Sequence, residues 1–311
     1  MRTIENAVKN AILLKPNENV LIIYDSPKEK IAKLFAKECE KITETTLARI
    51  KVRGQTKREP PKPIVEAMKN SDVVLGITTI SLTHTKAVRK ARKAGARIAT
   101  MPDITEKMFP ALAVNYKELA KNCKRIEKIL NKTNVIKIKT KLGTNLTLRC
   151  KGREAQSDDG ILDHSGSLHN LPTGEVGVAP IENSSNGKIV IDVCMVGVEK
   201  IKNSIEIHVK DGKMKKIVGK KEAKKLNKIF KKADKNAKIL CEFSIGLNQR
   251  AKIIGKVLND EKAIGTIHVA FGDNKSIGGK NESNVHLDGV IKKPTIWFDD
   301  KIIMKNGELL I

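Results

Sequence analysis

Five acidic or imidazole side chains lie in apolar, glycine-punctuated segments of the second half of the 311-residue chain. Glu175 lies in "NLPTGEVGVAP", Glu242 in "CEFSIGLN" and His268 in "GTIHVAFGDN". His286 and Asp288 are two residues apart in "NVHLDGV", so in an extended strand both point to the same face. Carboxylates and imidazoles without thiolates are typical of a catalytic Zn, Mn, Co or Fe site. We therefore predict that these five residues bind metal.

Each of these residues also has an ordinary explanation. Glu175 could face water at a strand edge, His268 could be a hydrogen-bonded core histidine, and Glu242 could pair with one of the many lysines. His286 and Asp288 could simply bond to each other. Their joint occurrence favours metal binding, and five ligands suit two divalent ions roughly 3.5–4 Å apart that share a carboxylate. The sequence leaves open which carboxylate would bridge.

The first part of the chain alternates apolar runs with helical patterns. This alternation predicts a parallel, doubly wound sheet, and so a Rossmann-like α/β domain over residues 1–132. The expected strands are 20–25, 46–52, 72–78 and 96–102. None is followed by GxGxxG, and GxxxxGK[ST] is absent from the chain, so no nucleotide-binding signature is present.

From residue 133 the pattern changes to short alternating strands. "KDGK" and "KNGE" contain the Asp-Gly and Asn-Gly pairs typical of type I′ hairpin turns. One helical pattern, at 220–235, interrupts the strands. These features predict an α+β catalytic, metal-binding domain over residues 133–311.

The net charge of +25 raises the question of a nucleic-acid partner. Lysine is mixed with glutamate along the chain, and aromatic residues for base stacking amount to only 3%. A nucleic-acid partner is therefore not expected. Lysine, isoleucine and glutamate enrichment fits a thermophilic proteome instead.

The chain has no apolar run near the roughly 18 residues of a membrane span, and its N-terminus lacks the apolar region of a signal peptide. A cytoplasmic protein without a membrane partner is expected. The five scattered cysteines contain no CxxC pair, which predicts buried free thiols.

The motifs around the five residues, together with "KNGELL", resemble those of the aminopeptidase T and aminopeptidase S family of leucyl aminopeptidase-like metalloenzymes. The resemblance implies metal ligands at Glu175, Glu242, His268, His286 and Asp288. It also implies a pair of divalent ions (Zn, Co or Mg), a peptide substrate and a homodimer. The leading hypothesis is thus a hydrolase, a metal-dependent aminopeptidase with Glu242 as the general base.

The same superfamily contains 2,5-dihydroxypyridine dioxygenase, which suggests an alternative. In it, His268, His286 and Asp288 form the 2-His-1-carboxylate set of a mononuclear Fe(II) ring-cleaving dioxygenase. His164 and His169, in "DHSGSLHNLP", would then contact the substrate or would be loop residues. A third hypothesis is a nucleic-acid- or anion-binding protein on the same fold.

Overall fold

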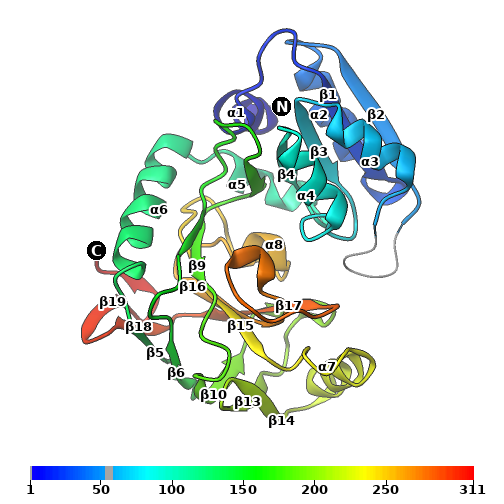
Figure 1. The fold of residues 1–311 in the computed structure, drawn as a ribbon. Coiled ribbons are helices and arrows are strands. Elements are labelled where there is room, and N and C mark those ends of the chain that lie inside the picture. The colour runs from blue at the N-terminus through cyan, green and yellow to red at the C-terminus, as the bar shows by residue number, and fades with distance from the viewer. Residues whose placement is uncertain (1, 53–58) are drawn as a thin grey trace. The chain divides into compact units, whose positions relative to one another are not determined.

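The computed structural model describes residues 2–52 and 59–311, and it divides the chain into two compact units (Figure 1). Unit 1 comprises the residues up to Ala120 together with Asp158–Thr173. Unit 2 comprises Lys121–Ser157 and Gly174–Ile311. The boundary expected between residues 132 and 133 stays a prediction.

Unit 1 is built on a five-stranded parallel sheet. β3 and β4 are buried along their whole length, as expected for parallel strands covered on both faces. In spatial order the strands are β2 (Thr45–Ile50), β1 (Val20–Asp25), β3 (Val73–Ile77), β4 (Arg97–Thr100) and β8 (Leu168–Asn170). The sheet agrees with the predicted α/β fold class.

Helices flank this sheet. They are α1 (Arg2–Ala7) with the π-helical turn η1 (Val8–Ile12), the 3-10 turn η2 (Ser26–Lys28), α2 (Glu29–Cys39), α3 (Lys62–Lys69), α4 (Lys86–Lys93), the 3-10 turn η3 (Glu106–Met108) and α5 (Phe109–Leu112). The hydroxyl of Thr85 caps the start of α4 by accepting a hydrogen bond from the Val88 amide. Gly95 follows the end of α4 with a φ of +109°, a left-handed conformation that glycine adopts readily at a helix C-terminus.

Unit 2 contains two sheets. The eight-stranded antiparallel sheet has the order β14 (Lys213–Val218), β13 (Ile205–Lys210), β10 (Asn186–Ile191), β6 (Asn145–Arg149), β5 (Val135–Lys139), β18 (Thr295–Phe298), β19 (Lys301–Lys305), β20 (Glu308–Leu309). The seven-stranded sheet has the order β12 (Glu199–Lys200), β11 (Cys194–Met195), β17 (His286–Lys292), β16 (Thr266–Gly272), β15 (Leu240–Gly246), β9 (Glu175–Val178), β7 (Gln156–Asp158). The predicted fold class, a parallel α/β sheet followed by an α+β domain, is confirmed.

Both predicted hairpin turns are present in unit 2. Asp211 and Gly212 connect β13 to β14 with φ values of +52° and +68°, and Asn306 and Gly307 connect β19 to β20 with +50° and +87°. Positive φ at both central residues is the mark of a type I′ turn. The remaining helices are α6 (Tyr116–Leu130), which contains the boundary between the units, α7 (Lys221–Lys232), α8 (Val257–Asp260) and the 3-10 turn η4 (Lys275–Ile277).

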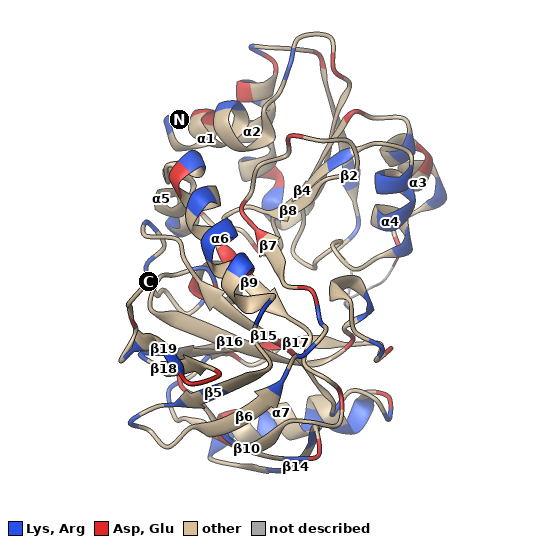
Figure 2. Cartoon of the chain, turned by 60° about the vertical axis from the view of Figure 1, so that its left-hand side comes forward, with Lys and Arg blue, Asp and Glu red and all other residues tan. Residues whose placement is uncertain are grey.

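Basic side chains recur on the helices of both units, as Figure 2 shows for α4, α6 and α7. None of the helices in the described part of the chain has the length and apolar character that a membrane crossing requires. The five cysteines are free and buried, as predicted.

The two sheets of unit 2 pack through large apolar side chains. Phe243 of β15 is fully buried and meets Phe298 of β18 edge to face, with ring centroids 6.3 Å apart. On β17, two strands away in the same sheet, a Cβ added to Gly289 would lie 2.7 Å from Ile191 of β10. This face of the seven-stranded sheet is therefore closed by the eight-stranded sheet.

Truncation of the Phe243 side chain should destabilise unit 2. We expect Phe243→Ala to lower the free energy of unfolding by about 3–5 kcal/mol, because it removes a large ring and leaves a cavity. Urea unfolding followed by circular dichroism measures the change. Leu142→Ala is the control, because Leu142 is 57% exposed. Equal stability of the two variants would show that the Phe243 contact is not a main support of this unit.

Candidate metal centre

All five predicted residues project from one face of the seven-stranded sheet. Side chains alternate along a strand, and directly paired residues on neighbouring strands share a face. The pairs that establish the common face are Gly246–Glu175, Ser244–His268, Glu242–Ala270, Ala270–Asp288 and Gly272–His286. This is the face opposite to Phe243. Glu175 is the first residue of β9.

Small residues between the charged side chains leave room for them. A Cβ on Gly177 would lie 1.8 Å from the Ser244 hydroxyl, so only glycine fits opposite this serine. The Ser244 hydroxyl in turn donates a 2.8 Å hydrogen bond to Glu242 Oε1. Gly177 therefore permits the contact that orients the Glu242 carboxylate.

Two imidazoles converge on two carboxylates at the centre of this face. His268 Nε2 lies 3.2 Å from Glu242 Oε1 and 3.8 Å from Asp288 Oδ1. His286 Nε2 lies 3.0 Å from Glu242 Oε2 and 3.1 Å from the same Asp288 Oδ1. The four side chains thus surround one small space with two nitrogen and three oxygen atoms.

The His286 ring is held in one orientation. Its Nδ1 lies 2.7 Å from the carbonyl oxygen of Asp273, which can only accept a hydrogen bond. Nδ1 is therefore the donor, and in the neutral ring Nε2 keeps its lone pair toward Glu242 and Asp288. This is the arrangement of a histidine that binds a metal through Nε2.

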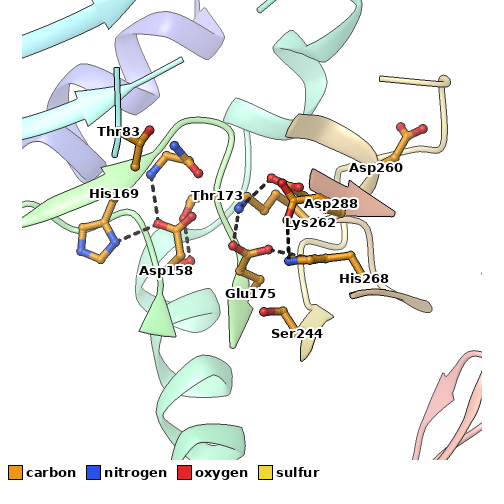
Figure 3. Close-up of polar contacts among 12 residues, drawn as sticks. Thr83, Asp158, His169, Thr173, Glu175, Ser244, Asp260, Lys262, His268 and Asp288 are labelled. Carbon is orange, nitrogen blue, oxygen red and sulfur yellow. Dashed lines mark hydrogen bonds and ion pairs between the residues drawn. The ribbon is translucent and has the colours of Figure 1, made fainter. Parts of the chain in front are cut away.

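Glu175 joins the cluster from the other side of His268. Its Oε2 lies 3.6 Å from His268 Nδ1, and its Oε1 accepts a hydrogen bond from Lys262 Nζ (Figure 3). Lys262 also contacts Glu261 Oε1 at 3.1 Å. Lys262 and Glu261 were not predicted from the sequence. The available signal was the pair of charges six and seven residues before His268, and one lysine stands out poorly among 60 basic residues.

The cluster is strongly negative, and its pKa values follow from that. Burial penalises the imidazolium of His268, but the carboxylates of Glu175 and Glu242 outweigh burial and raise its pKa to about 10. The pKa of His286 is also raised, because Asp288 outweighs burial. Burial likewise opposes ionisation of Glu242 and Asp288, yet the two histidines hold the pKa of both carboxyls low. The site therefore favours a positively charged occupant.

Three overlapping groups in the described chain have ligand atoms close enough to hold a metal ion. They are Glu175–Glu242–His268, Glu242–His286–Asp288 and Glu261–His268–Asp288. The structure thus brings all five predicted residues together and adds Glu261. Oxygen and imidazole ligands without a thiolate fit a divalent ion in a catalytic site.

His164 and His169 lie in unit 1. His169 is part of β8 and contacts Asp158 Oδ1 at 2.9 Å and Asp159 Oδ1 at 3.6 Å (Figure 3). His164 is exposed and pairs with Asp163 at 2.7 Å. Each histidine thus has a carboxylate partner within unit 1, and a contact with substrate stays a prediction.

Comparison with known proteins identifies relatives. A family model described as "NicX: 2,5-dihydroxypyridine 5,6-dioxygenase" matches residues 15–311. A 2,5-dihydroxypyridine 5,6-dioxygenase of Pseudomonas putida is 24% identical over 261 residues, which are 78% of this chain and 72% of the relative.

Two solved structures share the fold. The 2,5-dihydroxypyridine dioxygenase of Pseudomonas putida matches with a TM-score of 0.84 and 18% identity, covering 99% of this chain and 96% of the other. Wild-type AmpT from Thermus thermophilus matches with a TM-score of 0.72 and 17% identity, covering 100% and 98%. At these identities the structural likeness establishes the fold alone.

The leading functional hypothesis is wrong. The family model and the Pseudomonas relative are both dioxygenases, so the assignments of an aminopeptidase, a metalloprotease and a hydrolase do not hold. The role of Glu242 as general base in peptide hydrolysis depended on this hypothesis and is withdrawn with it. The motifs on which the resemblance rests therefore do not identify the reaction.

Loss of the Ser244 hydroxyl should weaken metal binding. We expect Ser244→Ala to lower the affinity for Co(II) by about 10- to 100-fold, the usual effect of removing a hydrogen-bond partner of a ligand. Competition with a chromophoric chelator measures the affinity. Ser204→Ala, next to β13 in the other sheet, is the control. An unchanged affinity in Ser244→Ala would show that Glu242 needs no such orientation, or binds no metal.

Proposed function

The chain belongs to the 2,5-dihydroxypyridine 5,6-dioxygenase family, and on this premise we propose that it is a metal-dependent dioxygenase that opens a hydroxylated pyridine ring. The observation that carries the proposal is the convergence of two imidazole Nε2 atoms on Asp288 Oδ1. Two histidines and one carboxylate are the ligand set of non-haem Fe(II) oxygenases.

We propose that a single Fe(II) is held by His268, His286 and Asp288. Ligand atoms around an octahedral ion with bonds of about 2.1 Å are roughly 3 Å apart. The 3.1 Å from His286 Nε2 to Asp288 Oδ1 matches this spacing, whereas the 3.8 Å from His268 Nε2 requires a small inward movement on binding. His286 is already oriented for binding by the Asp273 carbonyl.

Glu242 supports this site from between the two histidines. Its Oε1 accepts a hydrogen bond from Ser244 and lies 3.2 Å from His268 Nε2, and its Oε2 lies 3.0 Å from His286 Nε2. Because its pKa is held well below the usual range, Glu242 contributes a full negative charge. This charge favours a divalent cation at the position that the histidines face.

Bound Fe(II) supplies the electron transfer that O2 needs to react with a closed-shell aromatic ring. The protein's own contribution is to fix the ligands on a rigid sheet. Gly177, Ala270 and Gly272 lie between the ligands on the same face, which keeps large side chains away from the metal. The substrate class, a dihydroxypyridine, is transferred from the family's name. The predicted homodimer stays a prediction.

The activity can be tested with 2,5-dihydroxypyridine. We expect the anaerobically Fe(II)-loaded protein to consume one O2 per ring and to abolish the ring absorbance. Asp288→Ala should lower kcat/KM by more than about 100-fold, because loss of a ligand exceeds the loss of an outer partner.

His208→Ala is the matched control, because His208 of β13 also pairs with a carboxylate, Glu206, but lies in the other sheet. It should keep full activity. Fe(II) binding without any O2 uptake would exclude this substrate class. Equal loss in His208→Ala and Asp288→Ala would contradict the assignment of the site.

A further inference from the structure

Lys262 is a lysine buried beside the metal centre, with 1% of its side chain exposed. It lies in the segment between α8 and β16, four residues before the start of β16. Lysine is rarely buried unless it is paired. Its ammonium group is paired twice, with Glu175 Oε1 at 2.5 Å and with Glu261 Oε1 at 3.1 Å.

The backbone fixes the place of this ammonium group. The Lys262 carbonyl accepts a 2.8 Å hydrogen bond from the Asn248 amide. Beneath the segment, a Cβ on Gly246 would lie 2.3 Å from the Ala263 carbonyl oxygen. The segment therefore lies directly on β15, and glycine at position 246 permits the close approach.

The two carboxylates that bind Lys262 are also members of the candidate metal groups. Glu175 belongs to the group with Glu242 and His268, and Glu261 belongs to the group with His268 and Asp288. A second divalent ion beside the first would draw on these two carboxylates. Their Oε1 atoms instead contact the ammonium group of Lys262, which is part of the protein itself.

Lys262 also determines the charge that a second ion would leave in the cluster. The four carboxylates of the cluster carry four negative charges when ionised, and Lys262 with one divalent ion supplies three positive charges. One negative charge then remains, whereas a second divalent ion would leave one positive charge and would lie beside the Lys262 ammonium group, whose like charge repels it. Without the lysine, two divalent ions would balance the carboxylates.

We infer that the Lys262 ammonium group occupies the place of a second cation and thereby limits the centre to one metal ion. Lys262 is a positioning residue: it holds Glu175, whose Oε2 faces His268 Nδ1 at 3.6 Å. At this distance the two buried atoms do not form a hydrogen bond, and a small shift on metal binding would let Glu175 orient the imidazole. The inference rests on the proposed single-ion function.

Metal stoichiometry tests the inference without measuring turnover. The full-length protein is loaded anaerobically with excess Co(II), separated from free metal, and its Co content is measured by mass spectrometry. We expect one ion in the wild-type protein, two in Lys262→Gln and one in Lys262→Arg, which retains the positive charge. One ion in a folded Lys262→Gln would overturn the role of Lys262 and leave the proposed function intact. No ion in the wild-type protein would overturn both.

A second measurement does not depend on the folding of a variant. Electron paramagnetic resonance of the wild-type protein with saturating Mn(II) distinguishes an isolated ion from a spin-coupled pair. The inference requires the spectrum of an isolated ion. A coupled pair in the wild-type protein would overturn it.

Discussion

The structure of the site depends on one constraint: four carboxylates lie close together, and their negative charge must be balanced. Three project from one largely buried face of a sheet, and Glu261 lies in the segment between α8 and β16. An isolated carboxylate loses several kcal/mol when it is taken out of water. Two histidines and Lys262 supply part of the balance in the protein itself. A divalent ion would replace the charge of the two imidazolium groups, which become neutral when they bind it, so the interaction that stabilises the cluster would also equip it for chemistry.

The two faces of the seven-stranded sheet have different roles. One face packs Phe243 against the eight-stranded sheet, and the other carries the ligands with small residues between them. Antiparallel pairing places residues from distant parts of the sequence opposite each other in a fixed register. Ligands on neighbouring strands are thereby held more rigidly than ligands on loops would be.

Much of this arrangement could be predicted from the sequence. Apolar runs identified the parallel strands, Asp-Gly and Asn-Gly identified the hairpins, and five acidic or imidazole residues in apolar strands identified the cluster. Lys262 and Glu261 were missed because their importance comes from burial, which lysine and glutamate do not signal. The reaction was mispredicted because the motifs specify a ligand-bearing sheet. They do not specify how many ions it holds, and by our inference that number depends on the contact between Lys262 and Glu175.

Anomalous diffraction at the iron edge, from crystals grown anaerobically with Fe(II), tests the central claim most directly. The account predicts one strong peak per protomer, bounded by His268 Nε2, His286 Nε2 and Asp288. A pair of peaks that extends to Glu175 and Glu261 would contradict it, as would a single peak away from the two histidines.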